Sequence, residues 1–380
     1  MPIPAARPFR IAGAGPSGLA AAIVLARAGH SVELFERRSV CGARFGGDLQ
    51  GLENWSSGAD VLEDFRSLGI ETDFHAAPCC QGTQTDGVHE DTFVFDRPAF
   101  YIVKRGDVPG SLDRSLARQA LQLGVDIRFG TPCPEGTADV EATGPRGRAP
   151  FAIDTGIVFE TDAPDCAVAL LNDDIAPGGY AYLLITEGYG CCCTMLFDDF
   201  RSIHERFART REALIERRGI SVWNARKVGG LGHVRARACW KSGVSRLVGE
   251  AAGLQDFLWG FGIRLAIRSG ALAASSLLAD ADATAYSDAA ESAFAGRLRV
   301  GVANRWLWER YSGNGYAIVR RALRTLGPLK VLRWIHEEHW WHRVAAPLGA
   351  RALRDRYPAV FAPSESMRAV SASAPDSSAA

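Results

Sequence analysis

The sequence predicts an α/β fold, α+β overall, in which a parallel-sheet domain is interrupted by β-rich segments and followed by helices. Near the start, a strand, a glycine-rich turn, a helix and a second strand follow one another within about 30 residues, which is a βαβ unit. A second junction of strand, glycines and helix begins far downstream, at Leu247. The last hundred or so residues have helical patterns and many tryptophans.

The first βαβ unit can be placed closely. Residues 9–12 are a short apolar strand, and 19–28 are an alanine-rich helix that Gly29 ends. Residues 31–36 (SVELFE) are a second strand that closes on an acidic residue. Two amphipathic patterns follow at 59–69 and 111–124, and each ends in glycine, so both predict helices.

Two stretches have the composition of strands and turns. Residues 72–104 are rich in Thr, Phe, Val and turn residues, and 151–196 form a second β-rich block with a Pro-Gly-Gly turn, so both predict β-structure inserted into the parallel domain. A charged helix is expected over 200–218 and a long helix of small residues over 263–278. The Ser/Ala-rich segment after Pro363 lacks core-forming residues and is expected to be disordered.

Composition excludes several classes of protein. The chain has 380 residues, 47% of them apolar, and its 43 basic residues balance 43 acidic ones, so nothing indicates nucleic-acid binding. Nine cysteines, three of them adjacent at Cys191–Cys193, form no disulfide framework and indicate a reducing cytoplasm. We expect these three to be small buried hydrophobes and no metal site. Neither a signal peptide nor a membrane span is expected.

The glycines after the first strand predict a dinucleotide site. Gly13 permits the tight turn, Gly15 lets the backbone approach a pyrophosphate, and Gly18 allows close packing of helix and strand. The pyrophosphate then lies at a helix N-terminus, where free N–H groups favour an anion. Glu36, at the end of the next strand, is placed to accept hydrogen bonds from ribose hydroxyls.

The second glycine segment favours FAD over NAD. Residues 248–253 (VGEAAG) and 260–263 (GFGI) again lead a strand through glycines to a helix start. Two helix starts far apart in sequence suit a long ligand that is bound along its length. The diphosphate of FAD would lie at the first turn, with the ribityl chain and flavin near the second.

These segments resemble a known family. LVGEAAGLQDFLWGFGIRLAIRSGALAA and GAGPSGLAAAIVLARAGHSVELFERR are similar to the geranylgeranyl reductase family, whose members have the p-hydroxybenzoate hydroxylase fold. PGGYAY at 177–182 resembles its substrate-domain motif, in which Tyr182 replaces a tryptophan. The resemblance covers roughly residues 8–280. It implies FAD as cofactor and a Rossmann-type FAD-binding domain with an inserted β-rich substrate domain and a helical C-terminal region.

The resemblance also implies site residues. Arg44 and Arg105 would contact the flavin, and Glu250 replaces the aspartate that hydrogen-bonds the ribityl chain. Gly262 and Ile263 would face the pyrimidine edge of the flavin. The full set of predicted cofactor-binding residues is Gly13, Gly15, Pro16, Ser17, Gly18, Glu36, Arg37, Arg44, Arg105, Glu250, Gly262 and Ile263.

Two residues are candidates for catalysis. By the same resemblance, Cys41 would face the flavin, where a thiol could deliver a proton to a reduced alkene. The alternative is a small residue packed in a crowded loop. Tyr180 lies in the substrate-domain motif and is the second candidate.

Three further patterns have plainer interpretations. Residues 229–233 (GGLGH) are expected to be a strand and turn beside the flavin, and Trp306 and Trp308 to pack in a core. His336, His339 and His342 are spaced i, i+3, i+6, as on one helix, and we expect a packing or substrate-pocket role for them.

The predicted domains follow from these assignments. The FAD-binding domain comprises 8–71, 105–150 and 245–285, and the β-rich substrate domain 72–104 and 151–244. The C-terminal helical region is 286–362, and the tail is 363–380.

Three functions remain open from the sequence. The first is reduction of a carbon–carbon double bond in an apolar small molecule by hydride transfer from flavin N5. The second is an FAD-dependent monooxygenase of a secondary metabolite, and the third a non-catalytic prenyl-binding protein on the same scaffold. The reductant would be NAD(P)H or a reduced electron-transfer protein. Peripheral membrane contact is possible for a lipid substrate, and the oligomeric state is left open.

Overall fold

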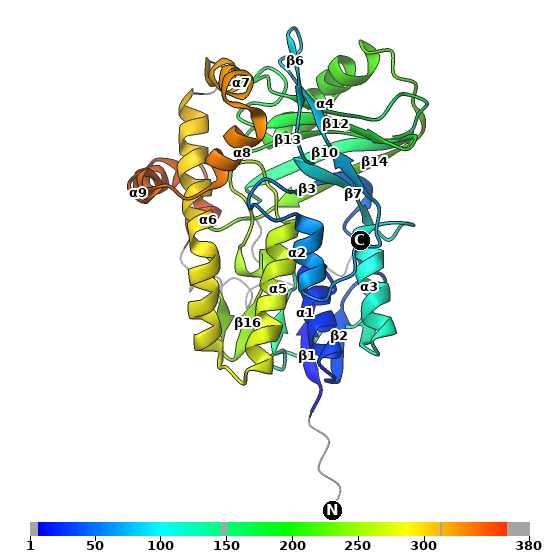
Figure 1. Cartoon of the computed structure of the whole chain (residues 1–380), viewed down its shortest axis with the longest axis vertical. Coiled ribbons are helices and arrows are strands. Elements are labelled where there is room, and N and C mark those ends of the chain that lie inside the picture. Colours follow the sequence, from blue (N-terminus) through cyan, green and yellow to red (C-terminus); the bar gives the residue numbers. More distant parts are fainter. Residues whose placement is uncertain (1–6, 146–149, 312–313, 363–380) are drawn as a thin grey trace, which may run out of the picture.

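The computed structural model describes residues 7–145, 150–311 and 314–362. Residues 1–6 and the predicted disordered tail lie outside these residues. Three sheets and ten α-helices are found in the described part of the chain. A sheet with flanking helices forms one half, and a large sheet that is antiparallel except where β11 pairs with β5 forms the other. The C-terminal helices run along one side of both (Figure 1).

The first sheet is the core of the Rossmann-type domain. Its order is β15-β16-β9-β1-β2-β8, and all neighbours pair in parallel except β15 with β16. Ile11 in its centre pairs with Leu34 on one side and Val140 on the other. The strands are β1 (Phe9–Ala12), β2 (Val32–Glu36), β8 (Asp126–Phe129), β9 (Val140–Glu141), β15 (Lys241–Ser242) and β16 (Ser245–Leu247).

Helices from distant parts of the chain pack together beside this sheet. Helix α1 (Pro16–Arg27) lies against α5 (Ile263–Leu278), and their contact is close because Gly270 has no side chain. A Cβ atom there would lie 2.0 Å from the Ser17 carbonyl oxygen. The neighbouring helices are α2 (Val61–Ser67) and α3 (Leu112–Gln122).

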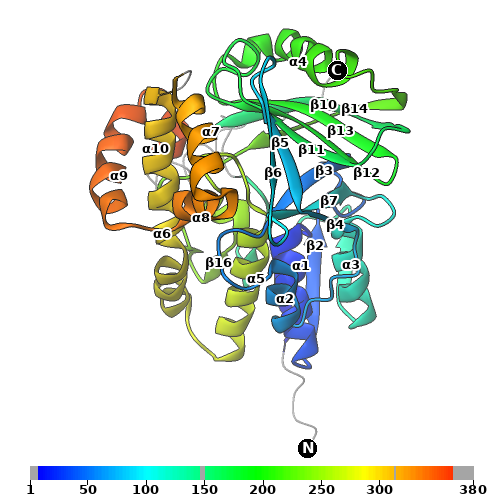
Figure 2. The same ribbon diagram turned by 45° about the horizontal axis from the view of Figure 1, so that its top comes forward.

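The largest sheet has seven strands in the order β14-β10-β13-β12-β11-β5-β6. Alternate side chains of its strands point to opposite faces, and those on the outer face are apolar. This apolar face packs against α4 (Ile203–Arg211) and the π-turn that follows it. Figure 2 shows α4 above this sheet. Cys191–Cys193 are fully buried in the sheet, as predicted. The strands are β5 (Gln81–Thr85), β6 (Glu90–Val94), β10 (Ala152–Glu160), β11 (Cys166–Leu170), β12 (Tyr180–Thr186), β13 (Tyr189–Leu196) and β14 (Trp223–Gly232).

The third sheet, β3-β7-β4, lies between the two halves. Strand β3 (Gly46–Glu53) comes from a segment to which the sequence motifs assigned no structure. Strands β4 (Ala76–Cys79) and β7 (Phe100–Gly106) come from the first β-rich stretch, 72–104. That stretch is thus divided between two sheets, because β5 and β6 join the large one.

The C-terminal region is helical, as predicted, but the expectation that His336, His339 and His342 share one helix is wrong. Helix α8 ends at His336, and Glu337 is extended, with φ −80° and ψ 144°. His339 caps the start of α9, so the three histidines are not on one helix. None of the described helices is long and apolar enough to cross a bilayer. The helices are α6 (Ala283–Tyr311), α7 (Asn314–Leu326), α8 (Pro328–His336), α9 (Trp340–Leu353) and α10 (Pro358–Phe361).

Candidate functional site: a dinucleotide cradle that opens into an apolar chamber

A single cavity of about 980 Å³ connects the three parts of the molecule. At one end it is lined by the glycine turn after β1, and at the other by α7 and α8. One face of the seven-stranded sheet covers it. The cavity is therefore long, and it begins where a dinucleotide would begin.

The three glycines of the turn have three different roles. Gly13 has φ +100°, and a Cβ atom there would lie 2.3 Å from the Ala142 carbonyl oxygen. A Cβ on Gly18 would lie 2.0 Å from the carbonyl oxygen of Gly13. Gly15 differs, because apart from its neighbours in the chain no described atom lies within 4 Å of the position its Cβ would take. The turn is thus closely packed on its inner side and open to the cavity at Gly15.

Two helix N-termini open into this cavity. Gly15 is the N-cap of α1 and Gly262 that of α5, and within the described residues no side chain accepts from their first N–H groups. Neither first turn contains an acidic residue. Pro16, Ser17 and Ile263 also line the cavity. Unsatisfied N–H groups and the helix dipole make both ends suitable for an anionic ligand.

Glu36 is fixed at the edge of the cavity by the backbone. One carboxylate oxygen accepts from the Ala14 N–H and the other from the Arg38 N–H, each at 2.9 Å. Arg37, beside it, is exposed and lines the same end of the cavity. This places the carboxylate next to the glycine turn, where the sequence motif predicts contact with a ribose.

The structure brings Arg44 and Glu250 together although they lie far apart in sequence. Their side chains form an ion pair of 2.7 Å, and Arg44 also donates to the carbonyl oxygen of Leu231. Gly229–Gly232 of β14 line the cavity here, next to this pair. Residues 229–232 are thus in a strand, as predicted, and they line the cavity.

Arg105 lines the cavity, but other protein groups hold its guanidinium. It donates to both oxygens of Asp113, at 2.8 and 3.0 Å, and to Gln50 at 2.9 Å. Its guanidinium carbon lies 4.2 Å from the centre of the Phe45 ring. Asp113 lies in a helix that the sequence showed only as amphipathic, so its pairing could not be predicted.

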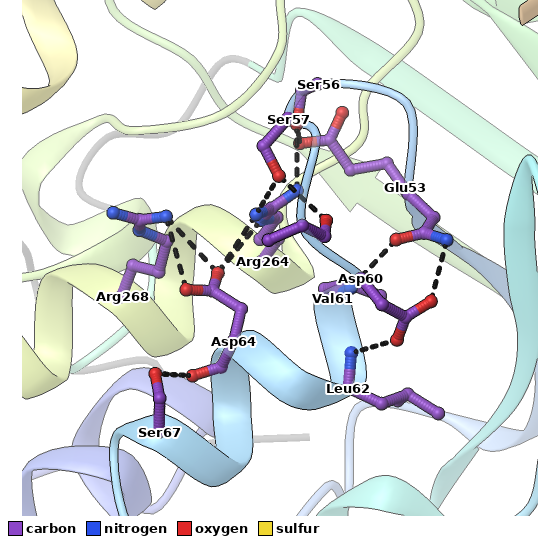
Figure 3. Close-up of polar contacts among 12 residues, drawn as sticks. Glu53, Ser56, Ser57, Asp60, Val61, Leu62, Asp64, Ser67, Arg264 and Arg268 are labelled. Atoms are coloured by element: carbon purple, nitrogen blue, oxygen red, sulfur yellow. Dashed lines mark hydrogen bonds and ion pairs between the residues drawn. The ribbon is translucent and has the colours of Figure 1, made fainter.

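A cluster of polar side chains that the sequence did not predict holds the start of α5 in place (Figure 3). The buried Arg264 pairs with Asp64 of α2 at 3.0 Å and donates to the hydroxyls of Ser56 and Ser57. Arg268, one turn further along α5, pairs with the same carboxylate at 3.2 Å. These contacts tie the N-terminus of α5 to the loop that carries the buried Trp55.

Cys41 does not lie where the resemblance implied. Its side chain is 4% exposed and belongs to the core, whereas its neighbours Val40 and Gly42 line the cavity. Burial, with smaller effects from nearby carboxylates, raises the pKa of the thiol to about 12. The structure therefore favours the packing alternative for Cys41.

Tyr180 does line the cavity, and its hydroxyl donates to the Trp259 carbonyl oxygen at 2.7 Å. Burial raises the pKa of this phenol. Its proton is therefore bound to a backbone acceptor, which makes Tyr180 better suited to shaping the chamber than to releasing a proton.

Asp154 is a further cavity-lining residue that no sequence motif indicated. It lies on β10 opposite Gly230 of β14, and a Cβ on Gly230 would lie 2.7 Å from Oδ1 of Asp154. The missing side chain thus leaves room for the carboxyl group. Burial, and secondarily the nearby Asp48, raises the pKa of Asp154 to about 6. Asp154 forms no ion pair with any residue that the structure describes.

The far end of the cavity is an apolar chamber. Its walls come from the β5–β6 hairpin, the loop before α5, and the inner sides of α7 and α8. The chamber-lining side chains include Phe93, Phe95, Trp259, Leu323, Leu332 and Ile335. Such a lining suits an apolar ligand.

Comparisons with known proteins agree with this geometry. A family described as NAD(P)-binding Rossmann-like domain matches residues 11–50. A geranylgeranyl bacteriochlorophyll reductase-like protein from Thermoplasma acidophilum has a similar structure, with a TM-score of 0.67 over 92% of this chain and 98% of that one, at 17% identity. The flavin-dependent brominase Bmp2 is similar at a TM-score of 0.61, over 92% and 98% of the two chains and also at 17% identity.

The chain has the fold of these flavoproteins. The expected mixed α/β architecture, with a Rossmann-type domain and C-terminal helices, is confirmed. A thiamine thiazole synthase from Methanothermobacter thermautotrophicus is 39% identical over 80 residues, which is 20% of this chain and 31% of that protein. The chain thus matches about a third of that curated relative.

Proposed function

We propose that this protein is an FAD-dependent oxidoreductase that reduces a carbon–carbon double bond in an apolar small molecule. The observation that carries the proposal is the continuity of the cavity from the uncapped start of α1 to the apolar chamber. A dinucleotide bound along the first part would leave its reactive end at the chamber. The similarity to a geranylgeranyl bacteriochlorophyll reductase-like protein supports reduction.

The residues present fit FAD. The open space at Gly15 and the free N–H groups of α1 suit a diphosphate, and Glu36 suits the adenosine ribose. The Arg44–Glu250 pair and the N-terminus of α5 lie further along the cavity, for the ribityl chain and the flavin. Bound FAD supplies hydride-transfer chemistry that no side chain of the protein can provide.

The chain's own contribution is a dry chamber and a proton. Reduction of a double bond consumes one hydride and one proton, so a proton donor must reach the chamber. Of the cavity-lining carboxyls, Glu36, Asp113 and Glu250 are each bound to other protein groups. Glu135 is exposed, and Glu141 lies beside Ala12 at the glycine turn, so Asp154 is the carboxyl best suited to this role. A carboxyl whose pKa is raised to about 6 exchanges protons readily near neutral pH. We assign the proton-donor role to Asp154 in place of Cys41.

A monooxygenase is the second candidate, and the similarity to the flavin-dependent brominase supports it. NAD(P)H or a reduced electron-transfer protein would supply electrons in either case. The two candidates differ in how fast the reduced flavin reacts with oxygen.

To measure this rate, the protein would first be reduced anaerobically and then mixed with air-saturated buffer in a stopped-flow spectrometer. Reoxidation over minutes is the result expected of a reductase, whereas reoxidation within seconds through a transient flavin adduct would contradict it.

A matched pair of variants tests the proton donor. Asp154→Asn should slow reoxidation of the reduced flavin by an apolar alkene at least tenfold, while Cys41→Ser should leave the rate within twofold of wild type. Reduction of the flavin itself is the control, because the proton donor does not act in that step. Equal rates for Asp154→Asn and the wild type would remove Asp154 from the mechanism.

A further inference from the structure

The outer sides of α7, α8 and α9 form a surface unlike the rest of the molecule. Helices α7, α8 and α9 all pack against α6 on one side of the protein, with α9 at its edge (Figures 1 and 2). Helices α8 and α9 meet where the centre of the Trp334 ring lies 6.0 Å from that of the Trp341 ring. Trp340 is 80% exposed and Trp334 is 54% exposed, both large fractions for tryptophan. Four other large apolar side chains are exposed on the same helices: Ile318, Leu326, Val344 and Leu348.

The exposed residues follow helical stripes that combine apolar and basic side chains. On α9 the stripe is spaced i, i+3, i+4, i+8, i+11, and on α8 it is spaced i, i+3, i+4. The α9 stripe consists of Trp340, Arg343, Val344, Leu348 and Arg351, and the α8 stripe of Lys330, Arg333 and Trp334. Helix faces of this composition are typical of peptides that lie in the interface of a bilayer.

Charge distinguishes this region from the rest of the chain. Residues 314–353 contain seven Arg or Lys and two Glu, although the whole chain is neutral. Both glutamates are bound to arginines, Glu337 to Arg333 and Glu338 to Arg299. Two of the arginines, Arg320 and Arg324, pair with aspartates of the β5–β6 hairpin. Arg321, Lys330 and Arg351 form no ion pairs within the described residues. Basic side chains without an ion pair among the described residues thus lie on the same helices as the exposed tryptophans, which complements anionic lipid.

Two of these helices, α7 and α8, lie between this surface and the cavity. Val319 and Leu323 of α7 and Leu332 and Ile335 of α8 line the apolar chamber, while other residues of these helices face outward. No described residue of α9 lines the cavity, so α7 and α8 alone form the layer between the exposed surface and the chamber. An apolar ligand dissolved in a bilayer would need to cross only this layer.

We propose that α7, α8 and α9 bind the surface of an anionic lipid bilayer, from which an apolar substrate enters the chamber. The tryptophans and aliphatic residues would insert among the headgroups, and the basic residues would contact lipid phosphates. Docking itself does not depend on the proposed redox reaction, because it needs only the outer side of these helices.

Vesicle flotation tests the proposal with the full chain. We expect binding to vesicles of phosphatidylcholine with about one third phosphatidylglycerol, and at least tenfold weaker binding to phosphatidylcholine alone. The double variant Trp334→Ala/Trp340→Ala should lower the partition coefficient at least tenfold. Lys330→Glu should lower it by about fivefold or more. Trp223→Ala, which removes a tryptophan that is 48% exposed on β14, is the matched control and should bind as the wild type does.

Three results would overturn the proposal: no binding to anionic vesicles, equal binding by the double variant, or equal loss in the Trp223→Ala control. Sedimentation equilibrium identifies one alternative. Self-association that Trp340→Ala abolishes, without any vesicle binding, would make this surface an interface between copies of the chain. A protein that reduces its substrate in detergent but does not bind vesicles would overturn only this inference and leave the proposed function intact.

Discussion

The glycine turn allows a paired test that separates ligand binding from folding. Gly15 and Gly18 lie three residues apart, and each would be replaced by alanine. Gly15 has φ −80°, which alanine adopts without strain, and its Cβ would project into open cavity. Gly18→Ala would place a methyl group 2.0 Å from the Gly13 carbonyl oxygen, far inside van der Waals contact.

The two variants should therefore fail in different ways. Overpacking costs about 1–3 kcal/mol and occasionally more, so Gly18→Ala should lose at least ~3 kcal/mol of the free energy of unfolding. Gly15→Ala should lose ~1 kcal/mol or less of it, because alanine is only a poorer N-cap than glycine. Its methyl group would instead displace a bound diphosphate from a backbone N–H. Loss of one charge-assisted hydrogen bond, about 1.5–3 kcal/mol, weakens FAD binding by roughly 10- to 150-fold.

Thermal unfolding of the apoproteins and fluorescence titration with FAD measure the two effects. Gly15→Ala should unfold within a few degrees of wild type and bind FAD more weakly. Gly18→Ala should unfold at a clearly lower temperature. A folded Gly15→Ala protein that binds FAD as tightly as the wild type would refute the placement of the diphosphate at this turn.

Three further predictions concern residues that sequence motifs did not indicate or placed differently. Arg264→Met should lower the free energy of unfolding by about 2–3 kcal/mol in urea titrations, since it removes one partner of a buried ion pair but leaves Asp64 paired with Arg268; an unchanged midpoint would contradict the role given to this pair. Cys41→Ser should leave FAD affinity unchanged in the same titration, because the thiol lies in the core, and a tenfold loss would return Cys41 to the cofactor site. The pKa of Asp154 in the folded apoprotein is raised to about 6, so between about pH 4 and 6 the folded chain holds a proton that the unfolded chain has lost. Protonated Asp154 therefore stabilises the folded state fully below about pH 4, and this stabilisation is lost as the pH rises through 6. Asp154→Asn should remove this decline in the free energy of unfolding. Parallel pH profiles of that free energy for the variant and the wild type would contradict the raised pKa.

The sequence predicted the parts of the site that local chemistry determines. The strand, glycines and helix of the first βαβ unit are contiguous. Gly13 and Gly18 meet conformational or packing requirements of the protein that only glycine meets, and Gly15 leaves the backbone open to the cavity. The start of α5 at Ile263 was found in the same way, because glycines precede a helical run of small residues. These signals need no knowledge of how distant segments pair.

The missed features depend on contacts between distant segments. Asp154 reaches the cavity only because β10 and β14 pair in a register that places it opposite Gly230. Arg264 and Asp64 lie 200 residues apart, and nothing in either segment indicates the other. Cys41 was misplaced because a single residue in a loop can face the core while both neighbours face the cavity.

The break between α8 and α9 shows a limit of periodicity. Histidines spaced i, i+3, i+6 fit one helix, and neither proline nor glycine lies between His336 and Trp340 to indicate an end. The structure instead has an extended Glu337, and His339 donates its backbone N–H to the ring of His342 at 2.9 Å. A polar contact between side chain and backbone thus ends one helix and begins the next.

The measurement that tests the central claim most directly is the absorbance spectrum of the purified protein, taken before and after anaerobic reduction. We predict the two visible bands of oxidised flavin, one FAD released per chain on denaturation, and bleaching of the bands on reduction. A folded protein that is colourless and takes up no added FAD would contradict the account. The cavity would then belong to a non-catalytic protein that binds an apolar ligand on a flavoprotein scaffold.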